Sequence, residues 1–214
     1  QKDHITKEEH ELLLDACQKS FTLKKRQGTF SQFIMERNYM IMLTLWNTGA
    51  RVGDVAMFTD KTIDTRNRSA TFIVNKLSEK DDSGKIIKPV YHKVMLEDSY
   101  ILAYHEYVNK WNISGYIFTS YAMRDKDVTQ QKPILTKQIW TFLKQYAAIA
   151  GIDKNIHPHL YRHGIAIYMR DSGVLVDMIS KFLGHHSVEV TYNYYAKITP
   201  EFAWQQIQDK MRVN

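Results

Sequence analysis

The amino-acid sequence predicts a mainly helical α+β domain that carries a small antiparallel sheet. Apolar residues recur at helical spacing through several stretches of ten or more residues. Two shorter runs, Ala70–Asn75 and Val90–Leu96, are instead rich in β-branched residues that alternate with polar ones. The chain has 214 residues, which allows one large domain or two small ones with a substantial core. Its 44% hydrophobic and 24% charged residues are ordinary for a folded protein.

Two helices are expected in the first fifty residues. Thr6 and Glu9 have the spacing of a capping box, which predicts a helix over Lys7–Lys19. The apolar stretch Phe33–Trp46 has helical periodicity and is long enough to form a core helix. Gly49 is well placed to end that helix in a left-handed conformation.

A β-hairpin and two further helices are expected next. The two β-branched runs are joined by a charged segment rich in turn residues, which predicts a hairpin with a long, mobile tip. The apolar pattern of Ser99–Trp111 predicts one helix. Thr136 as N-cap and Gly151 as C-cap enclose another, over Lys137–Ala150.

The stretch His157–Lys197 concentrates reactive side chains. Five of the nine histidines lie in it, together with two arginines and five tyrosines. His159, Arg162 and His163 are spaced i, i+3, i+4, so they share one face of a helix that is expected to stop at Gly173. A second, shorter amphipathic helix is expected after it. Arginine, imidazole and a late tyrosine together suit the attack of a phenol oxygen on a phosphodiester.

The composition limits the partner and the compartment. The net charge of +6 agrees with nucleic acid as partner. A single cysteine, Cys17, rules out an internal disulfide and is compatible with a reducing compartment. No apolar run reaches the length of a membrane span, and the first ten residues do not form a signal peptide. The sequence does not begin with methionine, as expected of a piece of a longer protein.

Three motifs resemble those of the tyrosine recombinase, or phage integrase, family. His159-Leu-Tyr-Arg162 resembles its H-x-x-R box, and Leu183-Gly184-His185 its L-G-H box. Upstream, Thr48-Gly49-Ala50-Arg51 resembles the start of its T-G-x-R-x-x-E motif, with Asp54 where the family pattern has Glu. The resemblance covers almost the whole chain, from Thr6 onward.

The resemblance implies a catalytic role for each matching residue. Two arginines would clamp the phosphate oxygens, and the carboxylate of Asp54 would fix the first guanidinium by a hydrogen bond. A hairpin lysine would protonate the leaving 5′-hydroxyl; Lys76 matches best, with Lys80 and Lys85 as alternatives. One histidine would act as general base or phosphate donor, and the L-G-H histidine as a further donor. The implied set is Arg51, Lys76, His159, Arg162, His185 and Tyr195.

Two tyrosines compete for the nucleophile position, which lies nine or ten residues after the L-G-H histidine in the family. Tyr194 and Tyr195 fit these two spacings. The ending Tyr195-Ala-Lys-Ile resembles the family pattern of tyrosine, small residue, His or Lys, and aliphatic residue. We therefore expect Tyr195 to form the 3′-phosphotyrosyl bond.

The resemblance also implies an architecture and partners. Residues 1–214 would form a single catalytic domain, without the N-terminal core DNA-binding domain of the family. Double-stranded DNA would be the partner, bound by a homotetramer that assembles through a C-terminal helix, Glu201–Arg212. The reaction would need no metal or other cofactor. The enzyme would act in the cytoplasm of a prokaryotic cell, at the nucleoid, without a membrane.

Three alternative functions are weighed against a site-specific recombinase. A type IB topoisomerase would use a nearly identical set of groups to nick and close DNA. A metal-dependent nuclease would need carboxylate partners for the clustered histidines, and no H-E-x-x-H motif is present. A non-catalytic DNA-binding protein would explain the charge, but not the combination of motifs.

Overall fold

The computed structural model describes residues 4–23, 28–120, 132–184 and 208 of the chain. Seven helices and five strands lie in this part. In chain order they are α1 (Lys7–Thr22), α2 (Thr29–Thr48), α3 (Val52–Ala56), β1 (Ile63–Asp64), β2 (Ser69–Ile73), β3 (Glu79–Lys80), β4 (Ile86–Lys88), β5 (Tyr91–Met95), α4 (Asp98–Trp111), α5 (Thr136–Ala150), α6 (Pro158–Asp171) and α7 (Val176–Leu183).

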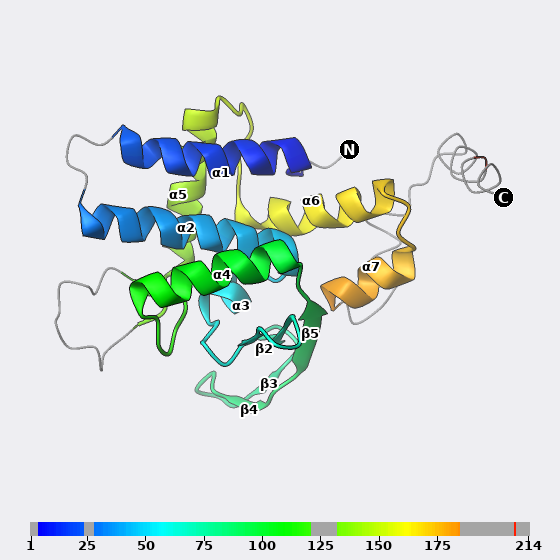
Figure 1. The fold of residues 1–214 in the computed structure, drawn as a ribbon. Helices are drawn as coiled ribbons and strands as arrows, with labels where there is room; N and C mark the ends of the chain where they lie inside the picture. Colours follow the sequence, from blue (N-terminus) through cyan, green and yellow to red (C-terminus); the bar gives the residue numbers. More distant parts are fainter. Residues whose placement is uncertain (1–3, 24–27, 121–131, 185–207, 209–214) are drawn as a thin grey trace.

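The helices and the small sheet confirm the predicted fold class. In Figure 1, α1, α2 and α4 lie side by side, α5 crosses behind them, and the sheet lies below. The core fills the space between the helices, where Leu13 of α1, Leu45 of α2, Leu143 of α5 and Tyr161 of α6 are fully buried. These residues come from the apolar faces that define the helices in sequence.

The start of α1 has the predicted capping box. The backbone N–H of Glu9 donates to Thr6 Oγ1 (3.2 Å), and the backbone N–H of Thr6 donates to Glu9 Oε2 (3.0 Å). The second helix is longer than predicted, since it begins at Thr29. It ends as expected at Gly49, which has a φ of 57°. This backbone conformation is readily adopted by glycine alone.

The residues before α1 pack against α6. The backbone N–H of Ile5 donates to the carbonyl oxygen of Leu160 (3.2 Å), and the Ile5 side chain is fully buried. Gly164 faces this segment so closely that a Cβ atom there would overlap the carbonyl oxygen of Ile5. Lys154 binds both ends of the junction, with Nζ 2.9 Å from the carbonyl oxygen of His4 and 2.7 Å from Glu9 Oε1.

The predicted hairpin is present within a three-stranded sheet of order β1-β2-β5. Strands β2 and β5 are antiparallel, with Ala70 opposite Val94 and Phe72 opposite His92. The tip was expected to be a mobile loop, but β3 and β4 pair within it as a second small sheet. Asp81 closes the turn of this ribbon, because its Oδ1 accepts hydrogen bonds from Ser83 and from the backbone N–H of Lys85.

The last three helices lie close to their predicted positions. Helix α5 begins at Thr136, so Leu135 is the N-cap and the expected N-cap role of Thr136 is wrong by one residue. The side chain of Gln138 accepts a hydrogen bond from the backbone N–H of Leu135 (3.3 Å). This bond is consistent with a helix that begins at Thr136, one residue before the predicted start at Lys137. Helix α6 ends just before Gly173, as expected, and α7 follows. In the described part of the chain, no helix is both long and apolar enough to cross a membrane.

Candidate active site

Arg162 connects the segments that carry two of the sequence motifs. It lies on α6 and is only 9% exposed. Its Nη1 donates to the carbonyl oxygen of Gly49 (2.7 Å), and its Nη2 donates to the carbonyl oxygen of Leu183 (2.7 Å). Both carbonyls belong to helix ends, where backbone acceptors lack helical partners. The guanidinium therefore has a fixed position between the loop that leads to Arg51 and the L-G-H box.

Close packing brings the same two segments together. A Cβ atom at Gly49 would lie 2.7 Å from Leu183 Cδ2 and 3.1 Å from Phe182 Cε1. The end of α7 thus rests directly on the turn after α2, more than 130 residues away in sequence. Only glycine fits both this contact and the positive φ at position 49.

Arg51 is the N-cap of α3 and is half-buried. Within the described residues, no side chain accepts a hydrogen bond from its guanidinium. Asp54 was expected to fix this guanidinium and does not. Its Oδ1 instead accepts from the backbone N–H (3.1 Å) and the side chain (3.3 Å) of Asn75, and its Oδ2 has no partner in the described part of the chain. One helical turn after Arg51, the short Asp54 side chain points toward the end of β2.

The Asp54–Asn75 hydrogen bonds place the candidate lysine. Lys76 follows Asn75 directly, in the turn after β2, and is exposed. This turn is thereby joined to α3, the helix that begins beside Arg51. Lys80 and Lys85 are exposed too, but they lie in the β3–β4 ribbon at the tip of the hairpin. The position of Lys76 therefore favours it over its two alternatives.

His159 lies one helical turn before Arg162, at the exposed start of α6. Its ring meets that of His157 edge to face, with the centroids 6.2 Å apart, and His157 stacks on Trp140 at 5.3 Å. Burial lowers the pKa of His157, and positive charge on His159 and Lys144 adds to the effect. His159 is thus the exposed ring at the end of a row of three, Trp140, His157 and His159.

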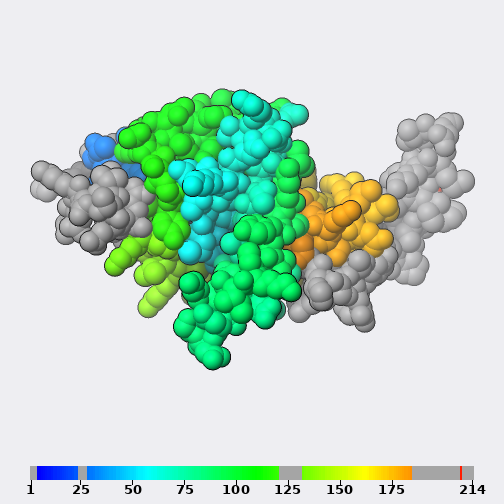
Figure 2. Space-filling view, turned by 90° about the horizontal axis from the view of Figure 1, so that it is seen from below, coloured from blue at the N-terminus to red at the C-terminus, as the bar shows by residue number. Residues whose placement is uncertain are grey.

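A further histidine, which the sequence analysis did not single out, binds the end of α7. The ring of His92, on β5, lies against Gly184, and its Nε2 is 2.8 Å from the carbonyl oxygen of Phe182. Figure 2 shows α7, in orange, lying against the green surface of the hairpin. The sheet that leads to Lys76 is therefore attached to the L-G-H box.

Several predicted features lie outside the described residues. These are His185, Tyr194, Tyr195 and the expected helix Glu201–Arg212. Helix α7 ends with Gly184 at a φ of 63°, immediately before His185. Among the described residues, no group of three or more His, Cys, Asp or Glu side chains is arranged to hold a metal ion.

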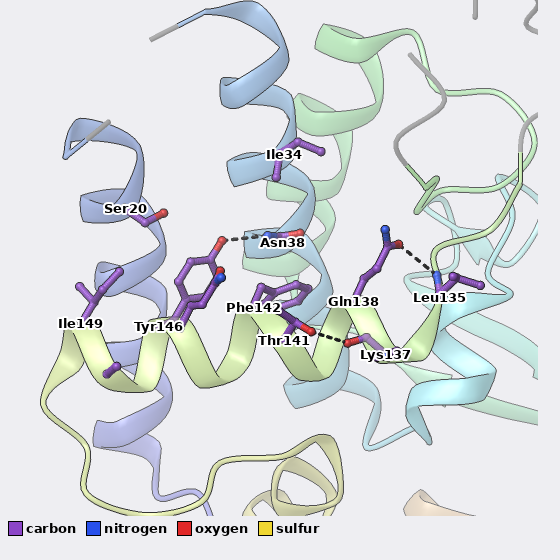
Figure 3. Close-up of a pocket in the computed structure, with 12 residues that line it drawn as sticks. Ser20, Ile34, Asn38, Leu135, Lys137, Gln138, Thr141, Phe142, Tyr146 and Ile149 are labelled. Atoms are coloured by element: carbon purple, nitrogen blue, oxygen red, sulfur yellow. Dashed lines mark hydrogen bonds between the residues drawn. The ribbon is translucent and has the colours of Figure 1, made fainter. Parts of the chain in front are cut away.

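A cavity of about 670 Å³ lies between α1, α2 and α5, away from these groups. Figure 3 shows its lining, in which Tyr146 accepts a hydrogen bond from Asn38 Nδ2 (2.8 Å). None of the candidate catalytic residues lines it. The described candidate residues lie instead at helix ends and along the hairpin, where Asp54 and Asn75 line a smaller pocket of about 440 Å³.

Comparison with known proteins gives one family. The profile of the phage integrase family matches residues 3–201. The tyrosine recombinase XerA of Thermococcus onnurineus is 29% identical over 178 residues, which are 83% of this chain and 56% of the relative. The chain thus spans about half the length of the curated relatives that it matches.

Solved structures agree on the fold. A crystal structure of XerA recombinase has a TM-score of 0.69 at 18% identity, over 98% of this chain and 65% of that one. The integrase of transposon Tn1549, in complex with a circular intermediate DNA, also has a TM-score of 0.69 at 18% identity, over 98% of this chain and 66% of that one. At this level of identity the likeness shows the fold alone.

Proposed function

This chain belongs to the phage integrase family, and we propose that it cuts and rejoins double-stranded DNA at specific sites. The reaction proceeds through a covalent 3′-phosphotyrosyl intermediate, which keeps the energy of the phosphodiester for the rejoining step. The relatives that the chain matches are named tyrosine recombinases, which does not favour the topoisomerase alternative.

The geometry of Arg162 carries the proposal. Its guanidinium is buried and bonded to the carbonyl oxygens of Gly49 and Leu183, so three separate motifs meet at one cation. A guanidinium that is held in place before DNA binds can stabilise the charge on a five-coordinate phosphorus without reorganisation. Arg51, beside the same turn, supplies the second planar cation.

We propose the roles of His159 and Lys76 from their positions, and those of His185 and Tyr195 from their sequence motifs. His159 acts at the exposed start of α6 as general base or phosphate donor. Lys76 protonates the departing 5′-hydroxyl from the turn that Asp54 holds. His185, which follows the C-cap residue Gly184 in the sequence, donates to the phosphate, and Tyr195 is the nucleophile. Two arginines take the part that metal ions play in other phosphoryl transfers, so we propose that no metal or cofactor is required.

We propose that residues 1–214 act as a single catalytic domain and that the enzyme works as a homotetramer on DNA. Neighbours assemble through the segment Glu201–Arg212, whose Phe202, Trp204 and Ile207 give it an apolar side. Deletion of this segment should leave single-site binding intact and reduce synapsis, as measured by gel shift. We propose that the reaction takes place in the cytoplasm of a prokaryotic cell, at the nucleoid.

The proposal is tested with a nicked suicide substrate made from the native flanking DNA. The wild-type protein should form a covalent adduct with the 3′ phosphate, and EDTA should not prevent it. Tyr195→Phe should abolish the adduct and Tyr194→Phe should retain it. The reverse pattern would transfer the nucleophile role to Tyr194. If the wild-type protein forms no adduct, the proposed function is refuted.

A further inference from the structure

Two donors bind the last two carbonyls of α7. The carbonyl oxygen of Leu183 accepts from Arg162, and that of Phe182 lies 2.8 Å from His92 Nε2. A carbonyl can only accept, so His92 Nε2 carries the hydrogen. Carbonyls at the C-terminal end of a helix otherwise depend on water or on a capping turn. The end of α7 is therefore fixed from two sides, by α6 and by the sheet.

The His92 ring itself has little freedom to move. Phe72, its partner across the β2–β5 pair, contacts it edge to face with ring centroids 5.5 Å apart. On its other side lies Gly184, where a Cβ atom would be 3.0–3.1 Å from three atoms of the ring. The imidazole is thus enclosed between the sheet and the glycine of the L-G-H box, with its Nε2 on the adjacent carbonyl.

The location of His92 relates this contact to the reaction. The ring contacts Gly184, which directly precedes His185 in the sequence. The strand paired with β5 is β2, which ends just before Asn75 and Lys76. His92 therefore connects the strand pair that carries the candidate acid with the segment that carries the candidate phosphate donor.

We infer that His92 is a positioning residue, which sets the placement of His185 through the Phe182 carbonyl and the Gly184 backbone. This inference rests on the proposed function. His92 need not touch the DNA. Its effect on cleavage passes through His185, so the two residues act as one unit. A residue that only stabilised the sheet would lower the stability of the domain without this dependence on His185.

The test compares three single variants in the intact protein. His92→Phe keeps an aromatic ring between Phe72 and Gly184 and removes the donor. His92→Gln offers an amide N–H at a similar reach. His105→Phe is the matched control, because His105 is exposed on α4 and its ring lies beside that of Tyr104, with centroids 6.3 Å apart.

Single-turnover cleavage of the suicide substrate is measured at saturating DNA. His92→Phe should slow cleavage about 10- to 100-fold, the loss typical of removing a group that orients an active-site residue. Its Kd for DNA should stay within about twofold of the wild type, since the phosphate contacts that dominate binding are intact. His92→Gln should recover most of the rate, and His105→Phe should cleave normally.

A double variant provides a further test of the inference. In a His185→Ala background, His92→Phe should cost less than about twofold, because residues that act as a unit are not additive. An undiminished loss in that background, wild-type cleavage by His92→Phe, or failure of His92→Gln to recover would each overturn the inference.

A measurement without activity separates this inference from the proposed function. Hydrogen exchange at the Gly184 amide, which bonds the Lys181 carbonyl, should accelerate in His92→Phe and stay normal in His92→Gln and His105→Phe. If the wild-type protein formed no adduct, the proposed function would fail, and the exchange result would still decide whether His92 fixes the end of α7. Unchanged exchange in His92→Phe would overturn it.

Discussion

Replacement of Gly164 by alanine is predicted to destabilise the domain, against the usual rule for helices. In the middle of a helix, Gly→Ala normally stabilises by about 1 kcal/mol, because alanine has the better helix propensity. Gly164 is inside α6, yet a Cβ there would overlap the carbonyl oxygen of Ile5 and lie 3.1 Å from its carbonyl carbon. These are backbone atoms, so a side-chain rotation cannot relieve the overlap.

The size of the loss in stability follows from the contacts that the segment before α1 loses when it is displaced. Displacing it exposes the Ile5 side chain, at about 1.5–3 kcal/mol, and breaks its bond to the Leu160 carbonyl, at about 0.5–1.5 kcal/mol. After the gain in helix propensity, a net loss of about 1–3.5 kcal/mol remains. The sign is therefore decided by the contact with Ile5.

Urea unfolding followed by circular dichroism provides the assay, with Gly53→Ala as the matched control. Gly53 lies in α3, and a Cβ there would meet no atom within 4 Å. This control should be neutral or slightly stabilised, whereas Gly164→Ala should unfold at a clearly lower urea concentration. An increase in stability for Gly164→Ala equal to that of Gly53→Ala would refute the reasoning.

Three other predictions concern charge and proton transfer. Arg51→Lys should lose most strand cleavage and little DNA binding, because a point charge does not replace a bidentate fork; wild-type cleavage rates would contradict the role. Lys76→Ala should be rescued by a substrate with a 5′-bridging phosphorothiolate, whose leaving group needs no proton, and rescue only in Lys80→Ala or Lys85→Ala would move the role along the hairpin. Burial lowers the pKa of His10 to about 4, and its ring stacks on Trp46. The unfolded histidine protonates near pH 6.5 while the folded one stays neutral, so the free energy of unfolding should fall by about 3 kcal/mol from pH 6.5 to about pH 4. Urea titrations across that range provide the measurement. His10→Phe should reduce this loss, and His105→Phe should not.

Much of the fold follows from local chemistry and could be predicted. The capping box at Thr6 and the glycines at positions 49 and 151 mark helix ends because few residue types meet those backbone requirements. Helix α3 was missed because its five residues are too short to show a period. The β3–β4 ribbon was missed because its strands are only two and three residues long and lie in a segment rich in turn formers.

The site could be predicted only as far as its motifs reach. Arg162 was expected to clamp phosphate, but its bonds to Gly49 and Leu183 depend on how α6 meets two distant helix ends. Asp54 was assigned to Arg51 and binds Asn75 instead, since the side chain follows the direction of α3. His92 carries no sequence pattern, because a single histidine in a strand looks like any other. Such contacts arise from tertiary packing, which periodicity does not encode.

The bonds of Arg162 also join two residues that are made at widely separated times during translation. A ribosome makes Gly49 early and Leu183 late, roughly 7–27 s apart at about 5–20 residues per second. A chain released after Lys76 and before α7 contains Arg51 and Lys76 but lacks the Leu183 carbonyl to which Arg162 donates. For the activity proposed above, such an unfinished product lacks part of the arrangement that holds the guanidinium.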